Sequence, residues 1–124
     1  MTTLPPPTTL QTGHSAEAFA CNYLEDRGLI LLVRNYRGRF GEIDLVMRDD
    51  SMLVFIEVRQ RRSQRYGTPA ETVDARKQGR LRATAEQYLQ QHHPRESQKP
   101  CRFDIVAITD GPQGQQIEWL RDAF

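Results

Sequence analysis

Cysteine, long apolar runs and an excess of either charge are all scarce in this sequence. The two cysteines, Cys21 and Cys101, stand far apart and without metal-ligand spacing, which favours reduced, buried thiols in a cytoplasmic protein over a disulfide. No apolar run reaches the roughly 18 residues that would span a membrane. The 17 basic and 16 acidic residues leave a net charge of +1, so the chain as a whole does not attract polyanions.

The N-terminal stretch MTTLPPPTTLQT differs in composition from the rest of the chain. It lacks the basic and apolar regions of a secretory signal, and its three consecutive prolines disfavour a helix or a strand. We expect residues 1–12 to form a mobile tail. The remaining residues, 13–124, are enough for one folded domain and too few for two.

Hydrophobic periodicity predicts the order α-β-β-β-α-β-β. An apolar stripe at helical spacing covers residues 14–28 and ends at Gly28. The segment 29–36 starts with a nearly continuous apolar run, which predicts a strand buried on both faces. The pattern then predicts a hairpin of strands 42–47 and 52–59, a helix over 72–93, and strands over 101–109 and 116–120, the last at a sheet edge. The predicted fold class is α/β, a mixed sheet flanked by helices.

Carboxylates interrupt the two apolar strands of the hairpin. Glu42 and Asp44 lie in EIDLVM, and Glu57 lies in LVFIEVR, two residues before Arg59. A turn centred on Asp50 places Asp44 opposite Glu57 to within one residue.

Two carboxylates side by side in a partly apolar setting repel each other. A divalent cation would compensate, since Mg²⁺ is commonly held by one or two carboxylates, waters and phosphate oxygens. Neighbouring arginines would also compensate. The alternative is that these acids and arginines form solvated cross-strand pairs with a purely structural role.

The ordered set of motifs resembles a known family. The arrangement Glu17, GEID (41–44) and EVR (57–59) is similar to the acid–D–ExK layout of the PD-(D/E)XK nuclease superfamily. More closely, the chain resembles the YraN-like uncharacterised bacterial family, itself similar to archaeal Holliday-junction resolvases. The resemblance covers residues 13–124 and is carried by EAFACNYLEDRG, RNYRGRFGEIDLV, LVFIEVRQR, GTPAETVDARKQGRL, RFDIVAI and DAF.

This resemblance implies a restriction-endonuclease-like core and metal-dependent hydrolysis of DNA phosphodiesters, with branched or repair intermediates as candidate substrates. It implies that Asp44, Glu57 and the Val58 carbonyl bind Mg²⁺ or Mn²⁺, that Glu17 assists, and that the protein is a homodimer. Glu42 belongs to the GEID motif without an implied catalytic role. It is expected either to fix local structure or to pair with an arginine.

Arg59 departs from the superfamily motif, which has lysine at this position. Arginine stabilises charge on a phosphate but stays protonated, so it cannot act as a base. Three readings follow: Arg59 substitutes electrostatically, Lys77 of the second helix approaches the site in its place, or catalysis is lost. In the third reading the chain is a nucleic-acid-binding or protein-interaction module.

Basic residues are concentrated between Arg59 and Arg82. This segment holds eight cations and two acids, a formal charge of +6 in a chain of net charge +1. Such asymmetry favours a phosphate-binding face beside the acids, although a solvated helix face is the simpler reading for any single arginine. The residues predicted to bind nucleic acid are Arg61, Arg62, Arg65, Arg76, Lys77 and Arg80.

Overall fold

The chain folds as a mixed sheet with a helix on each face. The computed structural model describes residues 9–61, 73–96, 99–112 and 114–124. In chain order the elements are α1 (Thr9–Glu25), β1 (Ile30–Arg37), β2 (Glu42–Asp49), β3 (Met52–Arg61), α2 (Ala75–His92), the 3₁₀ helix η2 (Pro94–Glu96), β4 (Arg102–Gly111) and β5 (Gly114–Leu120). The order of helices and strands is the predicted one, with η2 added in the segment expected to be a loop.

The five strands lie in the sheet in their chain order, β1-β2-β3-β4-β5. Strands β1, β2 and β3 form an antiparallel meander, and β4 pairs antiparallel with β5. Of the four neighbouring pairs in the described sheet, β3 and β4 form the parallel one. A parallel pair needs a long crossover, and α2 lies in the connection between these two strands.

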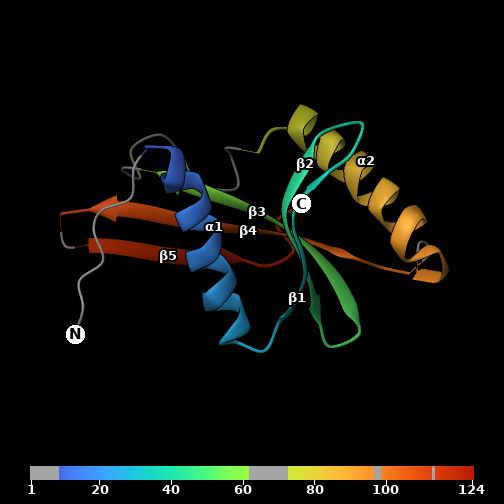
Figure 1. Cartoon of the computed structure of the whole chain (residues 1–124), viewed down its shortest axis with the longest axis horizontal. Helices are drawn as coiled ribbons and strands as arrows, with labels where there is room; N and C mark the ends of the chain where they lie inside the picture. The colour runs from blue at the N-terminus through green and yellow to red at the C-terminus, as the bar shows by residue number, and fades with distance from the viewer. Residues whose placement is uncertain (1–8, 62–72, 97–98, 113) are drawn as a thin grey trace.

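Each helix covers its own part of the sheet, and Figure 1 shows the strands running between α1 and α2. The α1 cluster contains Ala20, Leu24, Leu45, Met47 and Ile56, whereas the α2 cluster contains Val46, Phe55, Leu81, Tyr88 and Ile105. The alternation of Leu45, Val46 and Met47 between clusters is that of a strand with both faces buried. In the described part of the chain, neither helix is long and apolar enough to cross a membrane.

Both helices differ from their predicted bounds. Helix α1 begins at Thr9, inside the segment assigned to the tail. The three prolines end at Pro7, so nothing after them removes a helical hydrogen bond. Helix α2 is shorter than predicted because Asp74 is its N-cap, with its side chain accepting a hydrogen bond from the Lys77 backbone N–H at 2.9 Å.

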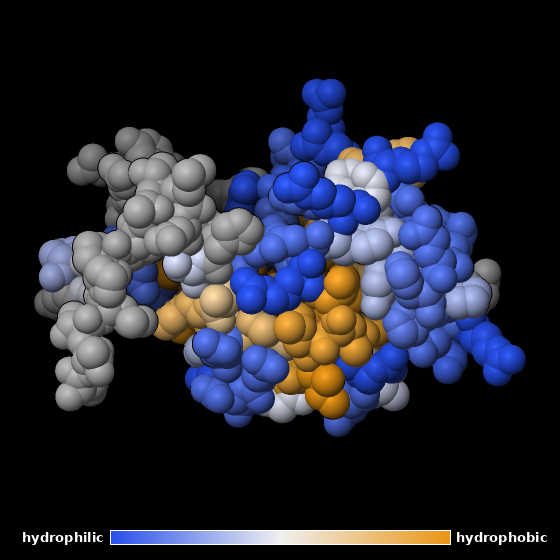
Figure 2. Space-filling view, viewed as in Figure 1, coloured by the Kyte–Doolittle hydropathy of each residue, from blue (hydrophilic) through white to orange (hydrophobic). Residues whose placement is uncertain are grey.

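The prediction that the first strand is buried on both faces is wrong. Strand β1 is an edge strand, in which Leu31 packs against the α1 cluster while Ile30 and Leu32 stay 61% and 36% exposed. An apolar run gives the same sequence pattern in an edge strand as in a central strand. The strands that lie beside it are decided by the topology of the sheet and not by the run itself. Figure 2 shows apolar side chains gathered at the surface in the region of α1 and β1.

The two cysteines are free thiols in different parts of the core. Cys21 belongs to the α1 cluster and is buried, whereas Cys101 packs against the α2 cluster and is half-buried. Burial, with a smaller effect of the neighbouring Glu25 carboxylate, raises the pKa of Cys21 to about 11. The expectation of reduced thiols agrees with this arrangement.

A buried carboxylate ties β4 to the end of the chain. Asp104 is fully buried and accepts hydrogen bonds from Arg102 Nε at 2.9 Å, Trp119 Nε1 at 2.9 Å and the Asp122 backbone N–H at 2.9 Å. Phe124 stacks on Phe103 with ring centroids 5.1 Å apart. The C-terminal residues are therefore held by both a polar network and aromatic packing.

We predict that Asp104→Ala lowers the free energy of unfolding by about 3–5 kcal/mol, because it leaves a largely buried arginine without its main partner. Asp110→Ala, on the same strand but at a more exposed position, should lower it by less than about 1 kcal/mol. Urea-induced unfolding of both variants measures the difference. Equal losses would show that the Asp104 network is not a stabilising feature.

Candidate functional site

The site lies where β2 and β3 separate. Their ladder runs from the Asp49–Met52 pair to the Leu45–Ile56 pair, which is the register predicted from the hairpin. Asp44 and Glu57 are the next residues along. There the Asp44 carboxylate accepts the Val58 backbone N–H through Oδ2 at 2.8 Å. A side chain thus takes the place of a backbone acceptor, and the ladder ends with two acids at the point of divergence.

An irregularity in β1 and β2 brings Asp44 to this position. Ile43 packs in the α2 cluster and Leu45 in the α1 cluster, although residues two apart on a regular strand share a face. On the paired strand, Asn35 lies at a positive φ of 54° between partners of Ile43 and Leu45. The pleat is therefore broken at Asp44, which is how its carboxylate reaches toward β3.

Ionising Asp44 is unfavourable in its position beside Glu57. Burial, followed by the Glu57 charge, raises the pKa of Asp44 to about 8, while the Val58 N–H opposes the rise. The Glu17 charge and a hydrogen bond to Glu57 raise the pKa further. Asp44 therefore keeps a proton near neutral pH unless a cation takes its place.

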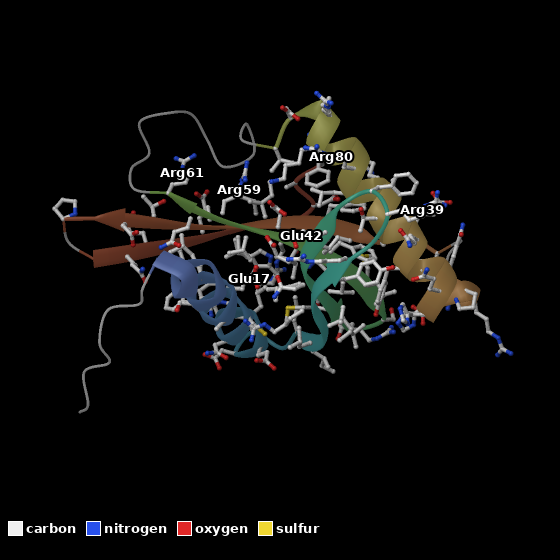
Figure 3. All side chains as sticks on the ribbon, turned by 45° about the horizontal axis from the view of Figure 1, so that its top comes forward. Glu17, Arg39, Glu42, Arg59, Arg61 and Arg80 are labelled. Atoms are coloured by element: carbon white, nitrogen blue, oxygen red, sulfur yellow. The ribbon has the colours of Figure 1, made fainter. Side chains whose placement is uncertain are left out.

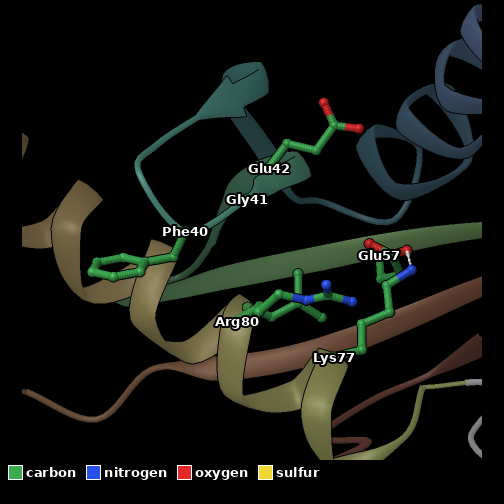
Figure 4. Close-up of a pocket in the computed structure, with 7 residues that line it drawn as sticks. Phe40, Gly41, Glu42, Glu57, Lys77 and Arg80 are labelled. Carbon is green, nitrogen blue, oxygen red and sulfur yellow. Dashed lines mark ion pairs between the residues drawn. The ribbon is translucent and has the colours of Figure 1, made fainter.

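Lys77 is the closest cationic partner of Glu57. Its Nζ lies 2.6 Å from Glu57 Oε1, whereas Arg59 Nη1 lies 3.8 Å from the same oxygen. The Glu57 side chain is only 9% exposed. Figure 4 shows Lys77 reaching from the first turn of α2 to Glu57 on the strand beneath. The Lys77 amine therefore lies at the acid pair, to which the sequence analysis expected it to come if it took the place of the motif lysine.

Glu17 approaches the same acids from α1. Its charge contributes to the raised pKa of Asp44, which places the two carboxylates within electrostatic reach. Within the described chain, Glu17 Oε2 is a buried atom with no hydrogen-bond partner. Buried polar atoms are normally satisfied, so this oxygen calls for a water or a cation.

The donor set suits a hard cation with few protein ligands. Among the residues described, no three or more His, Cys, Asp and Glu side chains lie close enough to hold a metal together. Asp44 and Glu57 offer adjacent carboxylates, and the Glu17 oxygen is nearby. Mg²⁺ commonly takes one or two carboxylates and fills its other positions with water and phosphate oxygens, so these residues fit it.

Glu42 does not join the acid pair. Its Oε2 lies 3.3 Å from Arg37 Nε, and half of its side chain is exposed. Figure 4 shows its carboxylate directed away from Glu57. Pairing with an arginine was one of the two roles left open for Glu42 by the sequence.

The basic residues divide into those near the acids and those that turn away. Figure 3 shows Arg59, Arg61 and Arg80 along one side of the molecule. Arg76 lies on the same helix as Arg80, one turn earlier, and both are exposed. Arg82 instead lies over the rings of Phe103 and Phe124, at 5.1 and 5.5 Å from their centroids. Two of the predicted residues, Arg62 and Arg65, lie outside the described part of the chain.

Two adjoining hollows share one aromatic residue. A cavity of about 200 Å³ is lined by Phe40, Gly41, Glu42, Glu57, Lys77, Arg80 and Leu81. A groove of about 410 Å³ is lined by Arg39, Phe40, Ala83, Glu86, Gln87, Gln90 and Gln91. The groove is not among the features predicted from the sequence, in which residues 37–41 only connect two predicted strands. The signal was present, because a bulky aromatic between charged and glycine residues is unusual in a tight turn.

The fold and site together define a mixed α/β protein with a carboxylate pair at a strand divergence and a lysine bound to it. Residues 16–108 match the profile of "Uncharacterised protein family UPF0102", and the chain belongs to this family. It is 50% identical to a UPF0102 protein of Nitrosococcus oceani over 119 residues, 96% of this chain and 95% of the relative. It is also 49% identical to a UPF0102 protein of Coxiella burnetii over 116 residues, 94% of this chain and 93% of the relative. The family membership indicated by the motifs is confirmed.

We predict that Asp44→Asn raises the melting temperature of the cation-free protein at pH 8 but not at pH 4. An acid whose folded-state pKa is raised is neutral in both states at low pH and opposes folding as the pH rises from about 4 to about 8. The amide cannot ionise, so the gain from the substitution should grow across that window. Thermal melts in EDTA at several pH values measure it.

The exposed acid Asp26 provides the control. Asp26→Asn should shift the melting temperature by a similar small amount at every pH. A constant difference for Asp44→Asn as well would mean that its carboxyl ionises normally in the folded protein.

Proposed function

We propose that this protein is a metal-dependent nuclease that hydrolyses DNA phosphodiesters on a restriction-endonuclease-like PD-(D/E)XK fold. The observation that carries the proposal is the Asp44–Glu57 pair at the divergence of β2 and β3, with the Lys77 amine against it. A structural ion pair would need only one acid. A second, mostly desolvated acid beside it is disadvantageous unless a cation binds both.

The topology supports the superfamily placement. An antiparallel meander, a crossover helix and a parallel return strand follow α1 in the order implied by the motif resemblance. The acids come from the second and third strands and the assisting acid comes from the first helix. Agreement of topology with motif order is more specific than a lone E-x-K, which is short enough to arise by chance.

Asp44, Glu57 and the Val58 carbonyl would hold Mg²⁺ or Mn²⁺. When bound, the ion would stabilise charge on the phosphodiester and lower the pKa of a water. The protein's part is to keep the two acids adjacent in a largely dehydrated setting, where their attraction for a cation is strong. Glu17 would assist by accepting a hydrogen bond from a water through its unpaired oxygen.

Lys77 and Arg59 divide the role of the motif lysine. Lysine can lose its proton on burial and so help to deprotonate a water, whereas arginine remains charged. The Lys77 amine lies closer to Glu57 than the Arg59 guanidinium, by 2.6 against 3.8 Å. We therefore assign orientation of the attacking water to Lys77 and stabilisation of phosphate charge to Arg59.

The nucleic acid would lie across the basic side of the molecule. The residues that would contact the DNA backbone, and position it without reading its sequence, are Arg61, Arg76 and Arg80, together with Arg62 and Arg65 of the undescribed segment.

We place the protein in the cytoplasm, in keeping with its free thiols. The homodimer implied by the resemblance would have twice the chain mass of 14.3 kDa in light scattering, and a 14.3 kDa particle at working concentration would contradict it.

Two observations favour a second function. Within the described residues no cluster of three metal-ligating side chains exists, and arginine stands where the motif has lysine. In this alternative the fold binds nucleic acid or a protein without cutting. The same experiment separates the two.

We predict that the wild type cleaves DNA with Mg²⁺ or Mn²⁺, tested on four-way junction, flap, single-stranded and duplex substrates. Asp44→Asn should lower the rate by at least about 100-fold, because it removes a carboxylate from the cation. Lys77→Met should lower it by about 100-fold, because it removes the amine that orients the attacking water. Arg59→Lys should retain or raise it.

Lys99→Met, an exposed lysine away from the site, is the matched control. Cleavage that persists unchanged in Asp44→Asn would contradict the site assignment. Binding without cleavage by the wild type and by Arg59→Lys would support the non-catalytic module instead.

A further inference from the structure

Phe40 is an exposed aromatic residue placed between the acid cavity and the neighbouring groove. It is 52% exposed and lines both hollows. Figure 4 shows its ring extending over α2, away from Glu57. Because the ring stands between two hollows, a ligand that occupies either of them would contact it.

The charge of the groove differs from that of the cavity. The cavity walls carry two acids and two cations, including the Lys77–Glu57 pair. The groove carries one residue of each sign, Arg39 and Glu86, among three glutamines. A carboxylate in so short a groove disfavours a phosphate. The groove suits an uncharged, planar group that offers hydrogen-bond donors and acceptors at its edge.

The turn that presents Phe40 is fixed to α2. The Arg39 backbone N–H donates to Gln87 Oε1 at 2.8 Å, and the Gly38 N–H donates to the Gly41 carbonyl at 2.8 Å. A side chain at Gly38 would meet Gln87 Oε1 at 2.5 Å, so glycine allows this close approach. The ring is therefore held over the groove before any ligand arrives, which lowers the entropy lost on binding.

Two glutamines that line the groove, Gln87 and Gln91, use their side-chain oxygens within the protein and keep their amide NH₂ groups for a ligand. Gln87 and Gln91 use their side-chain oxygens to accept the Arg39 N–H and the Tyr36 hydroxyl, at 2.8 Å each. Neither amide NH₂ group donates a hydrogen bond to another residue in the described part of the chain, so each is left as a donor for a ligand in the groove. Arg39 also places its guanidinium 5.9 Å from the Phe40 ring, beside the space where a stacked group would lie.

We propose that the Phe40 groove, lined by Arg39, Phe40, Gln87 and Gln91, binds an unpaired nucleobase next to the phosphodiester held at Asp44 and Glu57. This inference rests on the proposed function and names its substrate class. The base stacks on the Phe40 ring, and its polar edge accepts hydrogen bonds from the glutamine amides. A nucleotide within an intact duplex must first unstack, so the protein selects single strands, flaps and junctions over plain duplex.

The test measures DNA binding by the full chain carrying Asp44→Asn, without divalent cations, so that no hydrolysis intervenes. The probes are a single-stranded oligonucleotide with one 2-aminopurine and a duplex of the same sequence. Binding should quench the 2-aminopurine through stacking. Adding Phe40→Ala should abolish the quenching and raise the Kd for the single strand by about tenfold, while the Kd for the duplex changes less than about twofold.

Two further variants separate stacking from general surface effects. Phe40→Trp keeps an aromatic face and should restore both the quenching and the affinity. Phe19→Ala removes a comparably exposed phenylalanine, 44% exposed on α1 outside the groove, and should leave both unchanged.

The outcomes distinguish this inference from the proposed function. DNA that binds with equal affinity and equal quenching in Phe40→Ala overturns the base site and leaves the nuclease proposal standing. A protein that binds neither probe overturns both. Phe40-dependent binding in a wild type that never cleaves supports the base site and removes only the catalytic step.

Discussion

The cost of ionising Asp44, which is buried beside Glu57, is the constraint on which the other features of the site depend. The two acids follow directly after Leu45–Ile56, the last pair of the β2–β3 ladder. Beyond this pair, the Val58 backbone N–H donates to the Asp44 side chain instead of to a backbone carbonyl. The broken pleat at Ile43–Leu45 and the positive φ of Asn35 serve this placement. The Lys77 amine and the unpaired Glu17 oxygen then surround a pair that is short of positive charge.

Helix α2 links this pair to the surface that would contact a substrate. Its N-cap at Asp74 sets the first turn, from which Lys77 reaches Glu57 and Arg80 lines the cavity. Gln87, further along the same helix, accepts a hydrogen bond from the Arg39 backbone N–H and so holds the connection that carries Phe40. One helix therefore fixes the amine at the acids and the ring beside them. Helix α2 packs on the sheet beside β3. Lys77 of this helix can therefore reach Glu57, which the motif lysine on the strand would otherwise accompany.

Much of the fold and part of the site could be predicted from the sequence. The order of the helices and strands, and the placement of Asp44 opposite Glu57, followed from periodicity and from the centre of the hairpin turn. The edge position of β1 could not be predicted, because an apolar run such as LILLV does not reveal which strands lie beside it. The contact between Lys77 and Glu57 joins residues 20 apart in sequence, and only packing of α2 on the sheet decides it. The groove at Phe40 was not predicted, because residues 37–41 were considered only as the connection between two strands.

The most direct measurement is the anomalous diffraction of a crystal soaked in Mn²⁺, collected for the wild type and for Asp44→Asn. We predict one strong peak in the wild type, about 2 Å from carboxylate oxygens of both Asp44 and Glu57. The peak should be absent or much weaker in the variant. A wild-type crystal with no peak at these residues, or a peak that Asp44→Asn leaves unchanged, would contradict the assignment of this carboxylate pair as a metal site.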